Sequence, residues 1–172
     1  NGRIGRVLIS RALVKEQLLD HPVVYMSAYI NEHKQRYVDL LLNISRHGDE
    51  AWSHWIAFVL DAISTQAQDA IGRSERLITL REDYQRRLTD DSARAWLFKV
   101  VETLFAMPAV NVAEVVSQTG VSKPTAKAGI ECLERLKILS EYTGKRRDRD
   151  WIARDIIQII ELDCIDPSEE GT

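Results

Sequence analysis

The run NVAEVVSQTGVSKPTAK at residues 111–127 carries the signals of two short helices joined by a tight turn. Residues 112–119 predict the first helix, which is expected to end at Gly120 because glycine adopts the positive φ angle that the turn requires. Ser122 is expected to cap the second helix, and Pro124 is tolerated in a first helical turn. Two short helices joined through a glycine turn predict a helix-turn-helix.

The residues that follow this motif predict a wing. Residues 138–142 and 151–153 read as two strands that are joined by a polar turn at 143–150, and a last helix is predicted over 154–162. Together these elements predict a winged helix-turn-helix domain over 91–172 with a small β-hairpin as its wing. The second helix of the motif is expected to bury Ala126, Ile130, Leu133 and Leu136.

Upstream of this domain, apolar residues recur at three- and four-residue steps. This spacing predicts helices over 4–19, 23–46 and 50–88. The third helix is the longest, and the aromatic residues of its apolar stripe are expected to lie in the core rather than to bind a ligand. That stripe includes Trp52, Trp55, Ile56 and Val59.

A polar run at 89–92 marks the expected boundary between two domains, 1–90 and 91–172. Asp91 or Ser92 is expected to cap the helix that follows the run. With helices predicted over most of both domains, the chain is expected to be mainly α.

The composition is that of a globular protein, with 45% hydrophobic and 28% charged residues and a net charge of −3, so any nucleic-acid surface has to be local. Residues 91–160 hold 11 Lys and Arg against 9 Asp and Glu. Cys132 and Cys164 have neither CxxC nor zinc-ligand spacing, a usage that is typical of the reducing cytosol. Because the chain shows no signal peptide and no apolar run of roughly 18 residues, we expect a cytoplasmic protein without membrane contact or a metal site.

The helix-turn-helix predicts duplex DNA as a partner. The start of the second helix of such a motif presents side chains to base edges and phosphates, and a basic wing can contact phosphates. Acidic neighbours such as Glu131 and Asp148 leave two readings open, a DNA-binding transcriptional regulator and a docking or homodimerisation module built from residues 50–172. The candidate DNA-binding residues are Ser122, Lys123, Thr125 and Lys127 on the helix and Lys145, Arg146, Arg147 and Arg149 on the wing.

The run NGRIGR at residues 1–6 leads directly into a predicted helix. A helix N-terminus offers unpaired amide groups and the positive end of the helix dipole. Arg3 and Arg6 are three residues apart, so they fall on one helical face, and arginine binds phosphate oxygens in a bidentate manner. A polyphosphate is the expected ligand of this run.

The same run resembles the end of the signature of the Fic family, His-Pro-Phe-x-Asp/Glu-Gly-Asn-Gly-Arg-x-x-Arg. Further stretches at 18–27, 48–52 and 141–146 are similar to bacterial Fic proteins and to the winged helix that often follows their Fic domain. The resemblance covers nearly the whole chain and identifies residues 1–90 as the C-terminal helices of a Fic domain. The residues that match the last four fixed positions of the signature are Asn1, Gly2, Arg3 and Arg6.

This resemblance implies a nucleotidyltransferase. Fic enzymes usually transfer AMP from Mg-ATP to a Ser, Thr or Tyr hydroxyl of a target protein, which is unknown here. By resemblance, Arg3 and Arg6 hold the triphosphate and neutralise the charge that develops on the leaving group. Gly2 lets the backbone approach the phosphates and Asn1 orients them. Tyr37 is expected to border the base pocket.

The chain departs from the signature at its beginning. The histidine that acts as general base and the acidic residue that holds magnesium would both precede Asn1, so no catalytic residue is expected within the chain. None of the four histidines present has the required spacing. We therefore expect a fragment, or a numbering that begins inside a longer protein. The chain alone is expected to be inactive, while its parent protein transfers AMP.

Overall fold

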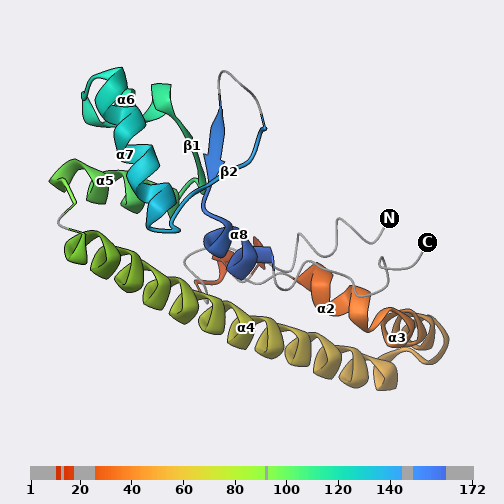
Figure 1. The fold of residues 1–172 in the computed structure, drawn as a ribbon. Coiled ribbons are helices and arrows are strands. Elements are labelled where there is room, and N and C mark those ends of the chain that lie inside the picture. The colour runs from red at the N-terminus through yellow and green to blue at the C-terminus, as the bar shows by residue number, and fades with distance from the viewer. Residues whose placement is uncertain (1–10, 13, 18–25, 92, 145–148, 162–172) are drawn as a thin grey trace. The chain divides into compact units, whose positions relative to one another are not determined.

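The computed structural model describes residues 11–12, 14–17, 26–91, 93–144 and 149–161. Most of these residues are helical, and a small three-stranded antiparallel sheet lies toward the C-terminal end of the chain (Figure 1). The predicted fold class, mainly α with a small β wing, is confirmed. The chain divides into two compact units, residues 1–73 (unit 1) and residues 74–172 (unit 2).

Unit 1 contains α2 (Met26–Glu32), α3 (Lys34–His47) and the first half of α4 (Asp49–Asp90). The single helix that was expected over 23–46 is wrong, because the chain leaves the helical region at His33, where φ is −107° and ψ is 32°. The His33 ring stacks on Tyr29, with ring centroids 4.2 Å apart. The core of the unit consists of Met26, Tyr29, Ile30, Phe58 and Ala62, with Tyr37 and Trp55 packed against it.

The long helix α4 confirms the helix that was predicted over 50–88. Its inward face in unit 1 runs through Phe58 and Ala62, which are fully buried. Trp52 lies off this face and is 47% exposed, so the expectation that it belongs to the core is wrong, and Ile56 beside it is 51% exposed. The sequence spacing did not separate these residues from the buried ones because apolar side chains occupy more than one side of the helix.

Unit 2 has the element order of a winged helix-turn-helix. The sheet order is β1-β3-β2, and the central strand places Trp151 between Val110 and Glu141. The first strand was not predicted from the sequence. The elements that follow α4 are α5 (Ala95–Leu104), β1 (Ala109–Asn111), α6 (Val112–Thr119), α7 (Lys123–Arg135), β2 (Ser140–Glu141), β3 (Asp150–Ile152) and α8 (Arg154–Glu161).

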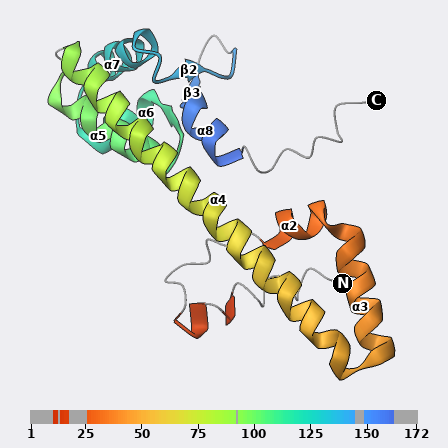
Figure 2. The same cartoon turned by 90° about the horizontal axis from the view of Figure 1, so that it is seen from below.

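The last turns of α4 belong to the core of unit 2. Figure 2 shows α5, α6 and α7 gathered at the C-terminal end of α4. Tyr84 and Leu88 of α4 are fully buried in one cluster with residues of every later helix and of β1 and β3. The compact units therefore meet inside α4, between Arg73 and Ser74, while the expected domain boundary after residue 90 stays a prediction.

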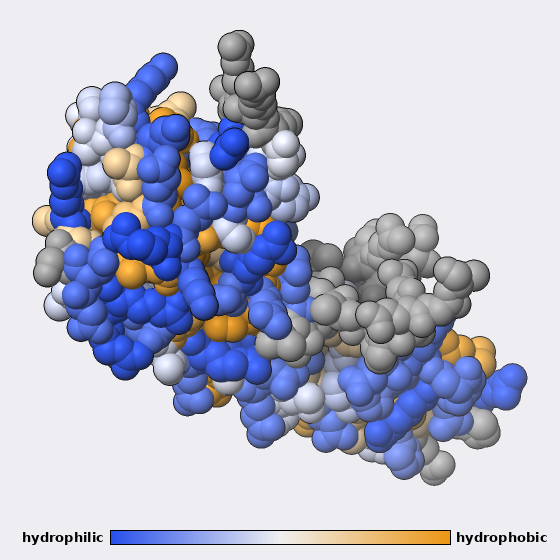
Figure 3. Space-filling view, viewed as in Figure 1, coloured by the Kyte–Doolittle hydropathy of each residue, from blue (hydrophilic) through white to orange (hydrophobic). Residues whose placement is uncertain are grey.

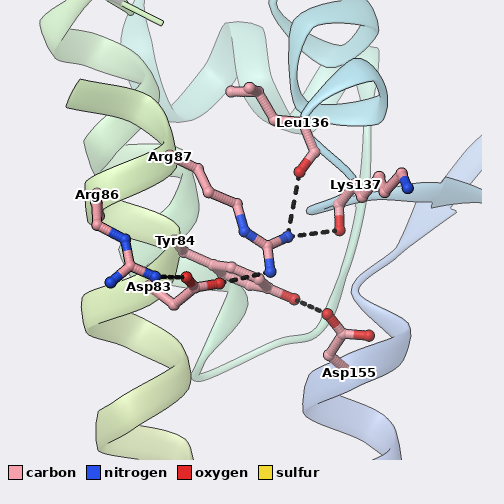
Figure 4. Close-up of polar contacts among 7 residues, drawn as sticks. All are labelled: Asp83, Tyr84, Arg86, Arg87, Leu136, Lys137 and Asp155. Atoms are coloured by element: carbon pink, nitrogen blue, oxygen red, sulfur yellow. Dashed lines mark hydrogen bonds and ion pairs between the residues drawn. The ribbon is translucent and has the colours of Figure 1, made fainter. Parts of the chain in front are cut away.

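A group of polar contacts joins α4 to the end of α7 and to the start of α8 (Figure 4). The Tyr84 hydroxyl donates to Asp155 at the start of α8 over 3.2 Å. The Arg87 guanidinium donates to the carbonyl oxygens of Leu136 (3.2 Å) and Lys137 (3.4 Å), at the C-terminal end of α7. A cation at this position satisfies helix carbonyls that have no partner within the helix. The C-terminal end of α7 is thereby held against α4.

Candidate nucleic-acid interface

The helix-turn-helix begins with a fully formed capping box on α6. The Asn111 side chain accepts from the Glu114 amide (3.0 Å), and the Glu114 carboxylate accepts from the Asn111 amide (2.8 Å). These reciprocal bonds satisfy two backbone donors at the helix start. Gly120 then ends α6 in the left-handed region at φ 73°, which confirms the predicted glycine turn.

The start of α7 is set by Ser122, as the sequence predicts. Its hydroxyl accepts from the Thr125 amide at 3.4 Å and lies 2.8 Å from the Thr125 hydroxyl. Pro124 occupies the first turn, where no internal amide bond is lost. The inward face of α7 is also confirmed, with Ala126, Ile130 and Leu133 buried and Leu136 packed against the same core.

Two lysines near the start of α7 are exposed to solvent. Lys123 is exposed, and Lys127 is exposed with a 3.8 Å ion pair to Glu131. Because both partners of this pair are well exposed, the pair contributes little stability, and Lys127 can leave Glu131 to bind another anion. In Figure 3 the visible surface of unit 2 is mostly hydrophilic, with hydrophobic side chains showing between the polar ones.

The wing is organised at its base by Glu141. The Glu141 carboxylate accepts from the Thr143 hydroxyl (3.1 Å) and from the Gly144 amide (2.8 Å). The Asp150 amide donates to the Thr143 hydroxyl and closes the hairpin. Arg149 is exposed on the returning side of the wing. Three expected wing residues, Lys145, Arg146 and Arg147, lie outside the described residues.

A close packing contact that the sequence reading missed joins α7 to α5. A Cβ atom placed on Gly129 would lie 2.2 Å from Cη2 of Trp96 and 3.0 Å from Cδ2 of Leu97. Glycine is therefore required at this position for α5 to approach α7 this closely. The available signal was a glycine inside a helical pattern. Glycine lowers helix stability there, so its presence indicates that a neighbouring side chain needs the space.

The first turn of α5 differs from the prediction. Its N-cap is Arg94, whose side chain makes no cap hydrogen bond, so the expected cap by Asp91 is wrong, and Ser92 lies outside the described residues. Asp91 instead pairs with Arg135 at 2.7 Å and accepts from the Cys132 thiol at 3.4 Å. Burial, with the hydrogen bond to Asp91, raises the pKa of the Cys132 thiol, which keeps this cysteine protonated.

The residues expected to bind nucleotide are separated from this interface in the sequence. Asn1, Gly2, Arg3 and Arg6 lie outside the described residues. Tyr37 lies in unit 1, where its ring packs against Trp55 and Phe58 with centroid distances of 5.3 and 6.2 Å. Its role beside a base pocket stays a prediction.

The described residues contain neither a cluster of metal ligands nor a membrane-spanning helix. No group of three or more His, Cys, Asp or Glu side chains lies close enough together there to hold a metal ion. None of the helices in the described part combines the length and the apolar character needed to cross a bilayer. A comparison with models of known protein families finds no family that matches this sequence.

Proposed function

We propose that the winged helix of unit 2 binds duplex DNA and that it is the accessory module of a Fic-type adenylyltransferase. The DNA-binding part rests on the exposed N-terminal half of α7, which carries Lys123 and Lys127 on a helix fixed at both ends. Such a helix fits the major groove, which is about 12 Å wide. Lysines on it bind phosphates by releasing condensed counterions.

The charge of the whole chain does not oppose this proposal. Its acidic surplus includes Glu161 and four more acidic residues after it, whereas the lysines of α7 lie more than 30 residues earlier in the sequence. Electrostatic binding responds to the local surface rather than to the net charge. Arg149 adds an exposed cationic side chain on the wing.

Salt-dependent binding of a mixed-sequence duplex tests the proposal. Fluorescence anisotropy between about 50 and 200 mM salt is expected to show binding that weakens steeply with salt. Lys123→Ala, Lys127→Ala and Arg146→Ala are each expected to weaken it. Lys34→Ala removes the same charge from exposed helix α3 and serves as the matched control. Binding that is absent at low salt, or that all four variants alter equally, would contradict the proposal.

The adenylyltransferase part rests on the residues at 1–6. They match the last fixed positions of the Fic signature, and the winged helix follows in the order that the resemblance implies. In this function Arg3 and Arg6 bind the phosphates of Mg-ATP, Gly2 allows their close approach, and the general base is supplied from before Asn1. The Mg-ATP supplies the AMP that is transferred to a protein hydroxyl.

The test of this part uses a protein that includes the residues before Asn1. ATP labelled at its α-phosphate is expected to label protein in that longer chain, and not in residues 1–172 alone. Arg3→Ala is expected to abolish the labelling, while Arg11→Ala, an exposed arginine further along the chain, is expected to retain it. A sequence other than His-Pro-Phe-x-Asp/Glu-Gly before Asn1 would show this part to be wrong.

A further inference from the structure

A hollow lies in unit 2, between the start of α5 and the N-terminal half of α7. It has a volume of about 490 Å³ and opens to solvent. Arg94 and Trp96 border it from α5, and Pro124, Thr125 and Ala128 border it from α7. Pro124 and Ala128 are exposed residues of α7, so a ligand that docks on this face of α7 also covers the mouth of the hollow.

The hollow has its position because of Gly129. The absence of a side chain there lets Trp96 lie directly against α7, and this contact brings the first turn of α5 alongside α7. Arg94 is the N-cap residue of α5 and immediately precedes that turn. Its guanidinium is therefore carried on a rigid element rather than on a free loop.

The charges around the hollow leave Arg94 available. Among the described residues, Asp91 is the one carboxylate that borders the hollow, and it forms an ion pair with Arg135 at 2.7 Å. Arg94 is exposed and forms no ion pair or side-chain hydrogen bond with any residue that the structure describes. Among the described arginines of unit 2, Arg81, Arg86, Arg87 and Arg135 form ion pairs with carboxylates. An exposed, unpaired arginine suits a phosphate group.

We propose that the hollow seats one phosphodiester strand of the bound duplex and that Arg94 contacts its phosphates. This inference rests on the proposed binding of DNA by α7. A helix that enters the major groove has a backbone strand on each side, and the strand on the α5 side passes over the hollow. Arg94 thus holds the duplex in register, while Lys123 and Lys127 face the groove. Contacts to phosphates fix orientation and carry no sequence information directly.

The salt dependence of duplex binding by the full chain tests this assignment. Each phosphate contact contributes about 0.9 to the slope of log K against log salt, so Arg94→Ala is expected to reduce the slope by about that amount. The loss of affinity is expected to be the same for duplexes of different sequence. Arg94→Lys keeps the charge and is expected to restore the slope. Arg76→Ala, an exposed arginine on α4, is the matched control.

The possible results separate this inference from the proposed function. If the wild-type chain binds no duplex, both are wrong. If it binds with a steep salt dependence while Arg94→Ala matches Arg76→Ala, only the hollow is wrongly assigned. A loss of affinity that depends strongly on the duplex sequence would also overturn it, because it would place Arg94 on a base edge. Because the Arg94 side chain caps no backbone group, Arg94→Ala is expected to keep the thermal midpoint of the wild type, which circular dichroism checks.

Discussion

The two compact units use similar helices but close their cores to different extents. Unit 2 buries one continuous cluster that draws on all of its helices and on two of its strands. The described helices of unit 1 bury a small cluster around Phe58 and leave large apolar side chains exposed. Those on α3 and the first half of α4 are Val38, Leu41, Leu42, Trp52, Ile56, Leu60 and Ile71.

This difference shows what a helical pattern can and cannot establish. An apolar stripe predicts a helix equally well in both units, but burial depends on whether another element covers the stripe. In unit 2 the sheet and three short helices cover the end of α4. The stability of unit 2 is therefore expected to depend on its internal packing far more than that of unit 1 does.

The largest expected effect comes from the same substitution made in each unit. Leu133→Ala removes a fully buried side chain of unit 2 and is expected to cost roughly 2–5 kcal/mol. Leu60→Ala removes a side chain that is 59% exposed in unit 1 and is expected to stay within about 0.5 kcal/mol of the wild type. Urea denaturation followed by circular dichroism measures both. Equal losses would mean that Leu60 is covered in solution and that the contrast between the units is wrong.

A second pair compares two glycines inside helices. Gly129→Ala is expected to destabilise by about 1–3 kcal/mol, because the new Cβ overlaps Trp96 and the gain in helix propensity does not offset this. Gly72→Ala in α4 meets nothing within 4 Å and is expected to stabilise by about 0.5–1 kcal/mol. Thermal unfolding of the two variants checks the opposite signs. A stabilised Gly129→Ala would show that Trp96 moves aside without cost.

The features that the sequence predicts are those that depend on neighbouring residues, and the features that it misses depend on distant segments. Gly120 and Ser122 were predicted because a turn glycine and a helix cap act on neighbouring residues. The strand at 109–111 was missed because its pairing with β3 depends on a distant segment. The contact of Arg87 with the end of α7 was missed for the same reason.

Part of the candidate site was predictable and part was not. Lys123 and Lys127 follow from the motif, since the start of its second helix faces outward. Arg94 does not, because its position beside α7 depends on the packing of Trp96 against Gly129. Site residues whose placement depends on neighbouring residues in the sequence can be predicted from it. Site residues whose placement depends on how distant helices pack cannot.

A third test concerns the polar contacts that hold α4 in unit 2. Tyr84→Phe is expected to cost about 1 kcal/mol near neutral pH, because Asp155 loses its hydroxyl donor. Burial and the Asp155 carboxylate raise the pKa of Tyr84. The stabilisation is therefore complete below the ordinary tyrosine pKa of about 10 and is lost as the pH rises above it. Urea midpoints of the two proteins are expected to converge in alkaline buffer, and a constant difference would contradict this.

The smallest expected effects concern the helix caps of unit 2, which have no counterpart on α3 of unit 1, where His33 makes no cap hydrogen bond. Asn111→Ala removes one half of the capping box and is expected to cost about 1 kcal/mol. Ser122→Ala breaks a longer bond of 3.4 Å and is expected to cost less. Thermal midpoints rank the two variants, and duplex binding adds a second readout.

Ser122 lies at the start of α7, so its loss is expected to weaken DNA binding more than the loss of Asn111 does, although it costs less stability. If both properties follow the same order, the cap of α7 acts only through folding and the interface does not depend on how α7 begins.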